Sequence, residues 1–173
     1  GDASTVQANL TNVTGCSSKP GAFAALKVDG SVVAWGENAY GGDAATVQAA
    51  LTNVTAIHGS FYGAFAALKT DGSVVALGDS DSGGDASTVQ ANLTNVTGCS
   101  SKPGAFAALK VDGSVVAWGE NAYGGDAATV QAALTNVTAI HGSFYGAFAA
   151  LKTDGSVVAL GDSDSGGDAS TVQ

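Results

Sequence analysis

Residues 22–36 read Ala-Phe-Ala-Ala-Leu-Lys-Val-Asp-Gly-Ser-Val-Val-Ala-Trp-Gly, so an Asp-Gly pair stands between two runs of mostly apolar residues. An Asp-Gly pair flanked in this way is a strong signal for a β-hairpin. A two-residue turn at 29–30 would place Ala24 opposite Trp35 and make both faces of the hairpin largely apolar. A sheet with one face in water alternates apolar with polar residues, so we expect both faces of this hairpin to be covered by other parts of the protein.

The hairpin belongs to a repeat, because the same pattern returns at 64–78, 105–119 and 147–161. The string Gly-Asp-Ala-(Ser/Ala)-Thr-Val, which precedes each hairpin, begins at Gly1, Gly42, Gly84 and Gly125, and occurs once more at Gly167. We therefore divide the chain into units 1–41, 42–83, 84–124 and 125–166 plus the partial unit 167–173, all within a single repeat domain spanning 1–173.

The first unit is identical to the third, and the second is identical to the fourth. Residues 1–83 and 84–166 are identical at every position, and 167–173 repeat 1–7 once more. The chain is thus a cassette of two unequal units that is used twice. Natural repeats drift apart in sequence, so this identity indicates either a very recent duplication or deliberate design. We expect an engineered array built on natural parent repeats.

Each unit is predicted to hold a short helix and three strands. Val47, Ala50, Leu51 and Val54 recur at helical spacing, which fits one to two turns of helix packing one apolar edge. Residues 53–57 are predicted to form a strand ahead of the hairpin. A unit of about 42 residues, made mostly of antiparallel strands and covered on both faces, is typical of a β-propeller blade. We predict an all-β fold with short helical turns, in a β-propeller-like repeat array; an open β-solenoid is the alternative.

The segment from Val54 to Asp79 resembles the repeat of the regulator of chromosome condensation, in which a V-x-x-I-x-x-G strand leads into an A-L-K-x-D-G-x-V-x-A-W-G hairpin. The compact blade length is similar to that of the propeller-type bacterial β-lactamase inhibitory protein. The chain departs from this pattern at 15–20, which we expect to break the first strand of the odd units. It departs again at Leu77 and Leu160, where the family has Trp.

The resemblance implies a seven-bladed ring, and four units fall short of seven. Four blades could close on themselves, two chains could pair into one eight-bladed ring, or the array could stay open. Exposed end blades would leave apolar faces and strand edges in water, which favours association. We expect a homo-oligomer, with a symmetric dimer favoured, that serves as a non-catalytic structural scaffold. The alternative is a protein-binding propeller module of a bacterial secreted or surface protein, with a protein partner on its loop face.

Composition argues against several other functions. The net charge is −9 with six lysines and no arginine, so a cationic surface for nucleic acid is absent from the sequence. No apolar run is long enough to cross a membrane. No set of acid, base and nucleophile stands out beyond repeated turn carboxylates, so we expect no enzymatic activity and no cofactor.

The Asp-rich loops are the sharpest candidate for a ligand site. Three carboxylates in a Gly-rich stretch resemble a calcium loop, since Ca²⁺ takes six to eight oxygen ligands. We favour the alternative of an inter-blade turn, in which Asp, Ser and Gly are preferred for backbone reasons. The loops carry Asp79, Asp81 and Asp85 and, one cassette later, Asp162, Asp164 and Asp168.

Three further kinds of residue occur once per cassette. His58 and His141 have no ligand or catalytic partner at a suitable spacing, and we expect local hydrogen bonding. The two cysteines are expected to be free thiols, with a contact between two chains as the alternative. The Phe-Tyr pairs of the even units could form a binding rim, but we favour a role in filling a seam or the central channel. The cysteines are Cys16 and Cys99, and the Phe-Tyr pairs are Phe61-Tyr62 and Phe144-Tyr145.

Overall fold

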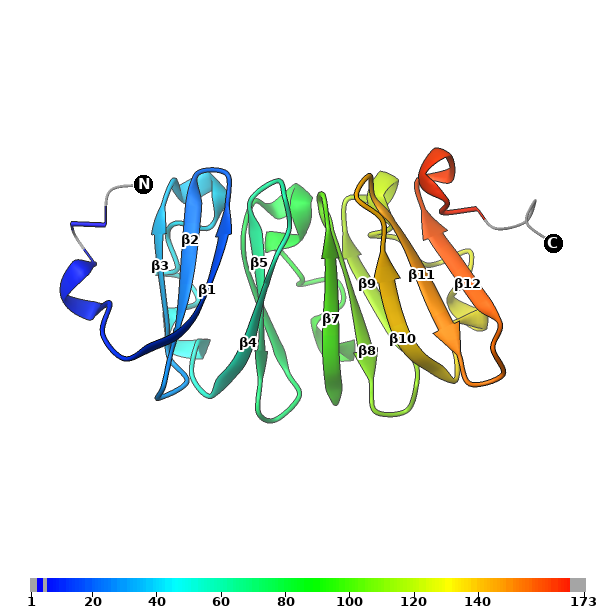
Figure 1. The fold of residues 1–173 in the computed structure, drawn as a ribbon, viewed down its shortest axis with the longest axis horizontal. Helices are drawn as coiled ribbons and strands as arrows, with labels where there is room; N and C mark the ends of the chain where they lie inside the picture. Colours follow the sequence, from blue (N-terminus) through cyan, green and yellow to red (C-terminus); the bar gives the residue numbers. More distant parts are fainter. Residues whose placement is uncertain (1–2, 5, 169–173) are drawn as a thin grey trace.

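The computed structural model describes residues 3–4 and 6–168, and each unit in it contains a separate three-stranded antiparallel sheet, or blade (Figure 1). In every blade the strands follow one another in sequence order, with the second strand in the middle. The all-β, propeller-like prediction is confirmed. The strands are β1 (Val13–Lys19), β2 (Ala22–Lys27) and β3 (Val32–Gly36); β4 (Val54–Gly59), β5 (Ala64–Lys69) and β6 (Val74–Gly78); β7 (Val96–Lys102), β8 (Ala105–Lys110) and β9 (Val115–Gly119); and β10 (Val137–Gly142), β11 (Ala147–Lys152) and β12 (Val157–Gly161).

Helical structure in the described residues is limited to single turns, and none of them is long and apolar enough to cross a membrane. The helix predicted around 47–54 is one turn of 3₁₀ helix, because Asn53 adopts a left-handed φ of 56° and the chain then enters β4. Asn tolerates this conformation better than most residues. The turns are η1 (Gln7–Asn9), η2 (Asn38–Tyr40), η3 (Gln48–Ala50), η4 (Ser80–Gly84), η5 (Gln90–Asn92), η6 (Asn121–Tyr123), η7 (Gln131–Ala133) and η8 (Ser163–Ser165).

The predicted hairpin register is wrong by one residue. The connection between β2 and β3 has three residues, not two, since the Lys27 amide donates to the Ser31 carbonyl at 2.9 Å. Gly30, the third loop residue, has a left-handed φ of 76°. A three-residue loop that ends on a left-handed Gly is a common hairpin connection, and an Asp-Gly pair suits it as well as the two-residue turn.

The corrected register changes which side chains share a face, because a shift of one residue reverses the side of every residue on one strand. Phe23, not Ala24, lies opposite Trp35, and their rings stack with centroids 5.1 Å apart. Ala22, Ala24 and Val32 therefore lie together on the other face. Each blade has one face with large aromatic or aliphatic side chains and one face rich in alanine.

The first strand of the odd units is intact, so the break expected at 15–20 does not occur. β1 pairs with β2 from Val13 opposite Lys27 to Lys19 opposite Ala22, with one irregularity between Val13 and Gly15 and continuous pairing from Gly15 to Lys19. Pro20 lies in the turn after β1 together with Gly21, which has a φ of 87°. Proline lacks an amide proton and is tolerated in this position because it makes no ladder hydrogen bond there.

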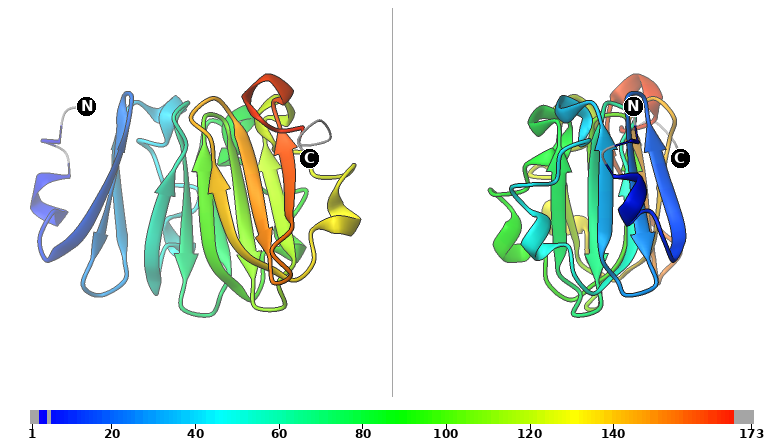
Figure 2. Two further views of the ribbon diagram at one scale, coloured as in Figure 1. Left: turned by 45° about the vertical axis from the view of Figure 1, so that its right-hand side comes forward. Right: turned by 90° about the vertical axis from the view of Figure 1, so that its left-hand side faces the viewer.

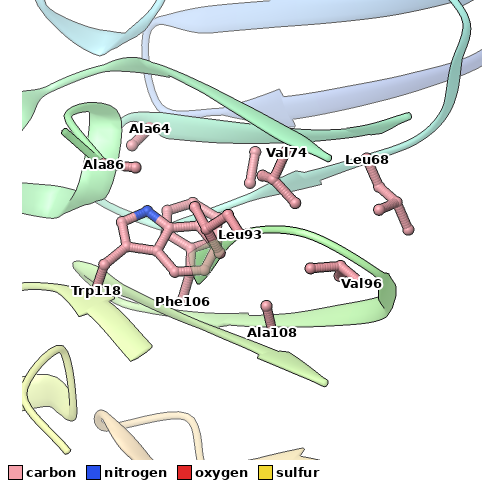
Figure 3. Close-up of a cluster of buried hydrophobic side chains, with 10 residues drawn as sticks. Ala64, Leu68, Val74, Ala86, Leu93, Val96, Phe106, Ala108 and Trp118 are labelled. Carbon is pink, nitrogen blue, oxygen red and sulfur yellow. The ribbon is translucent and has the colours of Figure 1, made fainter. Parts of the chain in front are cut away.

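The blades stack face to face in a row, and each junction holds its own apolar cluster. Phe65, Phe106 and Phe148 are fully buried, each against the Ala-rich face of the preceding blade. Leu77 and Leu160, which replace Trp, are also buried at 4% exposure, so the even blades pack closely in spite of the substitution. Figure 3 shows the middle cluster, in which Phe106 and Trp118 face Ala64 and Val74.

The row of four blades does not close on itself. The β1–β3 blade and the β10–β12 blade lie at opposite ends of the row in Figure 1, and the right-hand view of Figure 2 looks along the row. Within the described chain, the first blade therefore has no blade before it and the last blade has none after it. Residues 169–173 of the partial unit lie outside the described residues.

Acid should destabilise the hairpin tips. Asp71 accepts hydrogen bonds from the Ser73 amide at 2.9 Å and the Ser73 hydroxyl at 2.6 Å. These bonds hold the pKa of Asp71 below its usual value of 3.8, because they stabilise the ionised carboxylate. Since the pKa is lower in the folded than in the unfolded state, the stabilisation is complete above the unfolded value and is lost as the pH falls through the folded one. Melting temperatures measured between about pH 6 and about pH 2 should therefore decline in this range.

A variant with Asn at all four tips tests the cause of that decline. Asp29, Asp112 and Asp154 make the same bonds to Ser31, Ser114 and Ser156. Asn cannot titrate, so the variant should lose less of its melting temperature on acidification than the unchanged chain. An equal decline in both proteins would show that other carboxylates control the acid response.

Candidate functional site: the two end faces of the array

The two end faces of the row carry apolar residues that no other blade covers. We call the face of the first blade that points away from the second the Phe face. We call the face of the last blade that points away from the third the Ala face. Their members are defined by the equivalent residues of the middle junction. The Phe face consists of Cys16, Phe23, Ala25, Val33 and Trp35, and the Ala face of Ala147, Ala149, Leu151, Val157 and Ala159.

The middle junction shows how these two surfaces pack when they meet. Trp118 is 3% exposed, and its Nε1 donates a hydrogen bond to the Gly83 carbonyl at 3.0 Å. Its ring stacks on Phe106 at 5.1 Å. Gly83 lies so close that a Cβ atom there would stand 2.7 Å from the Phe106 ring. The junction is therefore closely packed and directional.

Polar bonds also connect the second and third blades. The Gln90 side-chain amide donates to the Val74 carbonyl at 3.0 Å. The Val96 amide donates to the Gly72 carbonyl at 2.9 Å. Because these bonds use fixed backbone groups, they set the register of one blade on the next as well as adding to the packing.

The end faces are sequence copies of the two sides of the middle junction, because 1–83 and 84–166 are identical. The Ala face of the fourth blade has the same residues as the face of the second blade that packs on the third. The Phe face of the first blade has the same residues as the face of the third blade that packs on the second. The end-face residues differ from their equivalents at the junction in how far they are exposed. Leu151 is 36% exposed where Leu68 is 8%, and Val157 is 52% exposed where Val74 is fully buried.

Cys16 and Cys99 occupy equivalent positions in the first and third blades. Both are free thiols, as predicted. Cys16 is exposed on the Phe face. Cys99 lies against the middle cluster, where burial raises the pKa of its thiol to about 12. A thiol held in the protonated form is a poor nucleophile, so Cys99 is suited to packing and not to reaction.

The remaining candidates do not converge on a reaction centre. His58 is half-buried on β4, and burial lowers its pKa because the charged imidazolium is disfavoured there. His141 is exposed on β10. Among the described residues, no three His, Cys, Asp or Glu side chains are grouped so as to hold a metal ion.

The Asp-rich loops form turns that are closed by their own carboxylates. Asp79 accepts a hydrogen bond from the Ser82 amide at 2.9 Å, and Asp85 accepts one from the Ser87 amide at 2.8 Å. The turn interpretation accounts for both contacts. In the second loop Asp162 accepts from the Asp164 amide at 3.4 Å, and Asp81, Asp164 and Asp168 are exposed.

The exposure of the Phe-Tyr pairs argues against the filled seam that we expected from the sequence, and a role in a central channel stays a prediction. Phe61 and Tyr62 are 48% and 42% exposed, and Phe144 and Tyr145 are 69% and 72% exposed. They lie in the turns between the first and second strands of the even blades.

Known structures identify the fold. No protein-family model matches the chain, and no curated protein matches it. Yeast RCC1 (Prp20) bound to Kap60 superimposes with a TM-score of 0.60 over 91% of this chain and 45% of that chain, at 16% identity. The fold is that of an RCC1-like β-propeller. Prp20p from Saccharomyces cerevisiae, in a structure concerned with binding to Gsp1p and histones, gives 0.59 over 91% and 46% at 16% identity. Human WBSCR16 gives 0.52 over 86% and 47% at 20% identity.

The chain spans about half the length of these relatives. At this level of identity the similarity concerns the fold alone. The four blades of this chain have the fold of about half of such a propeller.

Two matched Trp variants test whether the junction and the end face differ as described. Trp118→Phe should lower the free energy of unfolding by about 1–3 kcal/mol, because the buried Gly83 carbonyl loses its donor. Trp35→Phe should change it by less than about 0.5 kcal/mol in dilute solution, where no blade covers that ring. Denaturant titration at the lowest measurable protein concentration compares the two, and equal losses would contradict the assignment.

Proposed function

We propose that this chain is a non-catalytic structural scaffold whose function is to assemble with a second copy of itself. The Ala face of each chain packs on the Phe face of the other, and two four-blade arcs close into one eight-bladed ring. The observation that carries this proposal is the middle junction, in which the same two surfaces already pack within one chain.

The bonds of the middle junction define the bonds expected at the join. Trp35 Nε1 would donate to the carbonyl of the partner's Gly166, as Trp118 does to Gly83. The Val13 amide would donate to the carbonyl of the partner's Gly155, as Val96 does to Gly72. Val13 is 41% exposed where Val96 is 5% exposed, so the join would also bury a strand end.

Symmetry supports a closed assembly of two chains. A contact between two different surfaces produces a ring when its rotation closes and a filament when it does not. The arc superimposes over 91% of its length on about half of a propeller chain, which supports an arc that a second copy could extend into a ring. Two such arcs would supply eight blades, and both joins would then be equivalent. The identity of the cassettes further supports an engineered origin.

A different protein partner on the loop face is the alternative function. The exposed Phe144 and Tyr145 favour it, because large exposed aromatic side chains often mark interaction surfaces. A chain that stays monomeric at every protein concentration would favour this alternative over self-assembly.

The first test is the mass in solution. Light scattering after size exclusion should give twice the chain mass of 16.7 kDa. Leu151→Asp should give a folded monomer, because it places a charge in the join. Val111→Asp is the control, since Val111 is 75% exposed at a hairpin tip outside both end faces, and it should remain dimeric. A monomeric unchanged chain would refute the proposal, and a concentration-dependent series of larger species would refute the two-chain ring.

Thiol reactivity gives an independent test of the same join. In a Cys99→Ser chain the remaining Cys16 should react slowly with Ellman's reagent, because assembly would enclose it as Cys99 is enclosed. Adding Leu151→Asp should raise the rate at least about tenfold by exposing Cys16. Equal rates in the two proteins would show that the Phe face stays open.

A further inference from the structure

An aromatic groove lies across three consecutive blades on the face that carries the turns between first and second strands. It encloses about 160 Å³. Its wall comes from the turn after β4, the turn after β7, η6 and the turn after β10. We define the aromatic groove by its lining residues, which are Phe61, Tyr62, Pro103, Tyr123, Phe144 and Tyr145.

Tyr123 forms the centre of the groove and is fixed in place. A Cβ atom on Gly104 would lie 2.7 Å from its ring, and Gly146 packs against the other side of the ring. Both glycines have left-handed φ values, 73° and 99°, so no other residue fits these positions easily. The Tyr62 ring lies 5.6 Å from the Tyr123 ring, and the two hydroxyl oxygens are 3.4 Å apart.

The outer rings are held apart from the core. Phe61 meets Tyr62 edge to face at 5.6 Å, and Phe144 meets Tyr145 edge to face at 5.1 Å. Neither pair belongs to the three apolar clusters between blades. Four large aromatic side chains thus surround a surface groove without contributing to the packing of the fold, which indicates that the groove can receive a ligand.

Carboxylates give the groove a negative surround. The Glu120 carboxylate stands beside the Tyr123 ring, since a Cβ atom on Gly104 would lie 3.0 Å from Glu120 Oε2. Asp162 approaches from the other side, where the Ser165 hydroxyl bonds its carboxylate and lies 3.4 Å from the Tyr145 carbonyl.

The titration of Tyr123 agrees with this geometry. Its hydrogen bond to Tyr62, burial, and the negative charges of Glu120 and Asp162 together raise the pKa of Tyr123 to about 12. The nearby cation is Lys102, which precedes Pro103 and whose side chain extends along Gly142 of β10. The two carboxylates that act on Tyr123 favour a cation over an anion in the groove.

We propose that the aromatic groove binds a small quaternary ammonium ion of the choline type. The faces of aromatic rings attract a cation, and the attraction is greatest when the cation needs little hydration, as a methylated ammonium does. Its methyl groups suit a groove lined by five tyrosine and phenylalanine side chains and a proline, and it requires no hydrogen-bond acceptor. The groove lies within one chain, so the proposal does not require the ring; if the ring forms, each join adds a second groove built with the partner's Tyr40.

Choline and its neutral isostere 3,3-dimethylbutan-1-ol provide the probe, since they have the same shape and differ in charge. Calorimetric titration of the full chain should give a dissociation constant of roughly 1 mM for choline. The isostere should bind at least about tenfold more weakly, because the cation–π attraction is lost. Absence of choline binding up to about 50 mM, or equal affinity for the two probes, would overturn the proposal.

Variants locate the binding. Phe144→Ala with Tyr145→Ala removes two exposed rings that make no core contact, and should weaken choline binding at least about fivefold. Glu120→Gln should weaken it about two- to threefold. Asp112→Asn removes the same charge at the opposite end of the blade and should leave the affinity unchanged. Circular dichroism confirms that each variant is folded. Unchanged affinity in the double variant, or an equal loss for Asp112→Asn, would refute a site in the groove.

Discussion

The structure depends on one pairing of sizes between neighbouring blades, a phenylalanine ring on one blade against alanines on the next. Phe65 packs against the face that carries Ala22 and Ala24, and the same arrangement returns at each junction. Alanine leaves room for the ring and lets the sheets approach closely, and burying the ring removes a large apolar area from water. No single blade can cover both of its faces, so each blade is stabilised by its neighbours, and the two end blades pack on one neighbour only.

Much of the architecture could be predicted from the sequence because it follows from periodicity. The repeat, the three strands of each unit and the need to cover both faces all depend on which residue types recur. The register could not be predicted, since Asp29-Gly30 is compatible with a two-residue turn and with the three-residue loop that the chain adopts. That single residue decides whether Phe23 lies opposite Trp35 or Gly36, and with it the composition of each face.

The candidate sites likewise include features that could be predicted from the sequence and features that could not. Apolar end faces were expected from an open array, but their members became known only with the register and with the exposure of Leu151 and Val157. The aromatic groove was missed because its lining comes from three blades, and only the Phe-Tyr pair was visible in the sequence. The useful signal was that Phe61-Tyr62 has no counterpart in the odd units, where Pro20-Gly21 makes a shorter turn.

Because the two cassettes are identical, the two end faces do not depend on how many cassettes the chain contains. The first blade presents the face with Trp35 and the last presents the face with Leu151, and a chain of one cassette or of four would present the same pair. The ends therefore carry no information about the length of the chain between them. The number of blades in a closed assembly must be set by the angle between neighbouring blades, and so by side-chain volumes such as those of Trp118 and Leu77 at the alternating junctions. In the ring that we propose, changing those volumes would alter the number of blades without changing the two end faces.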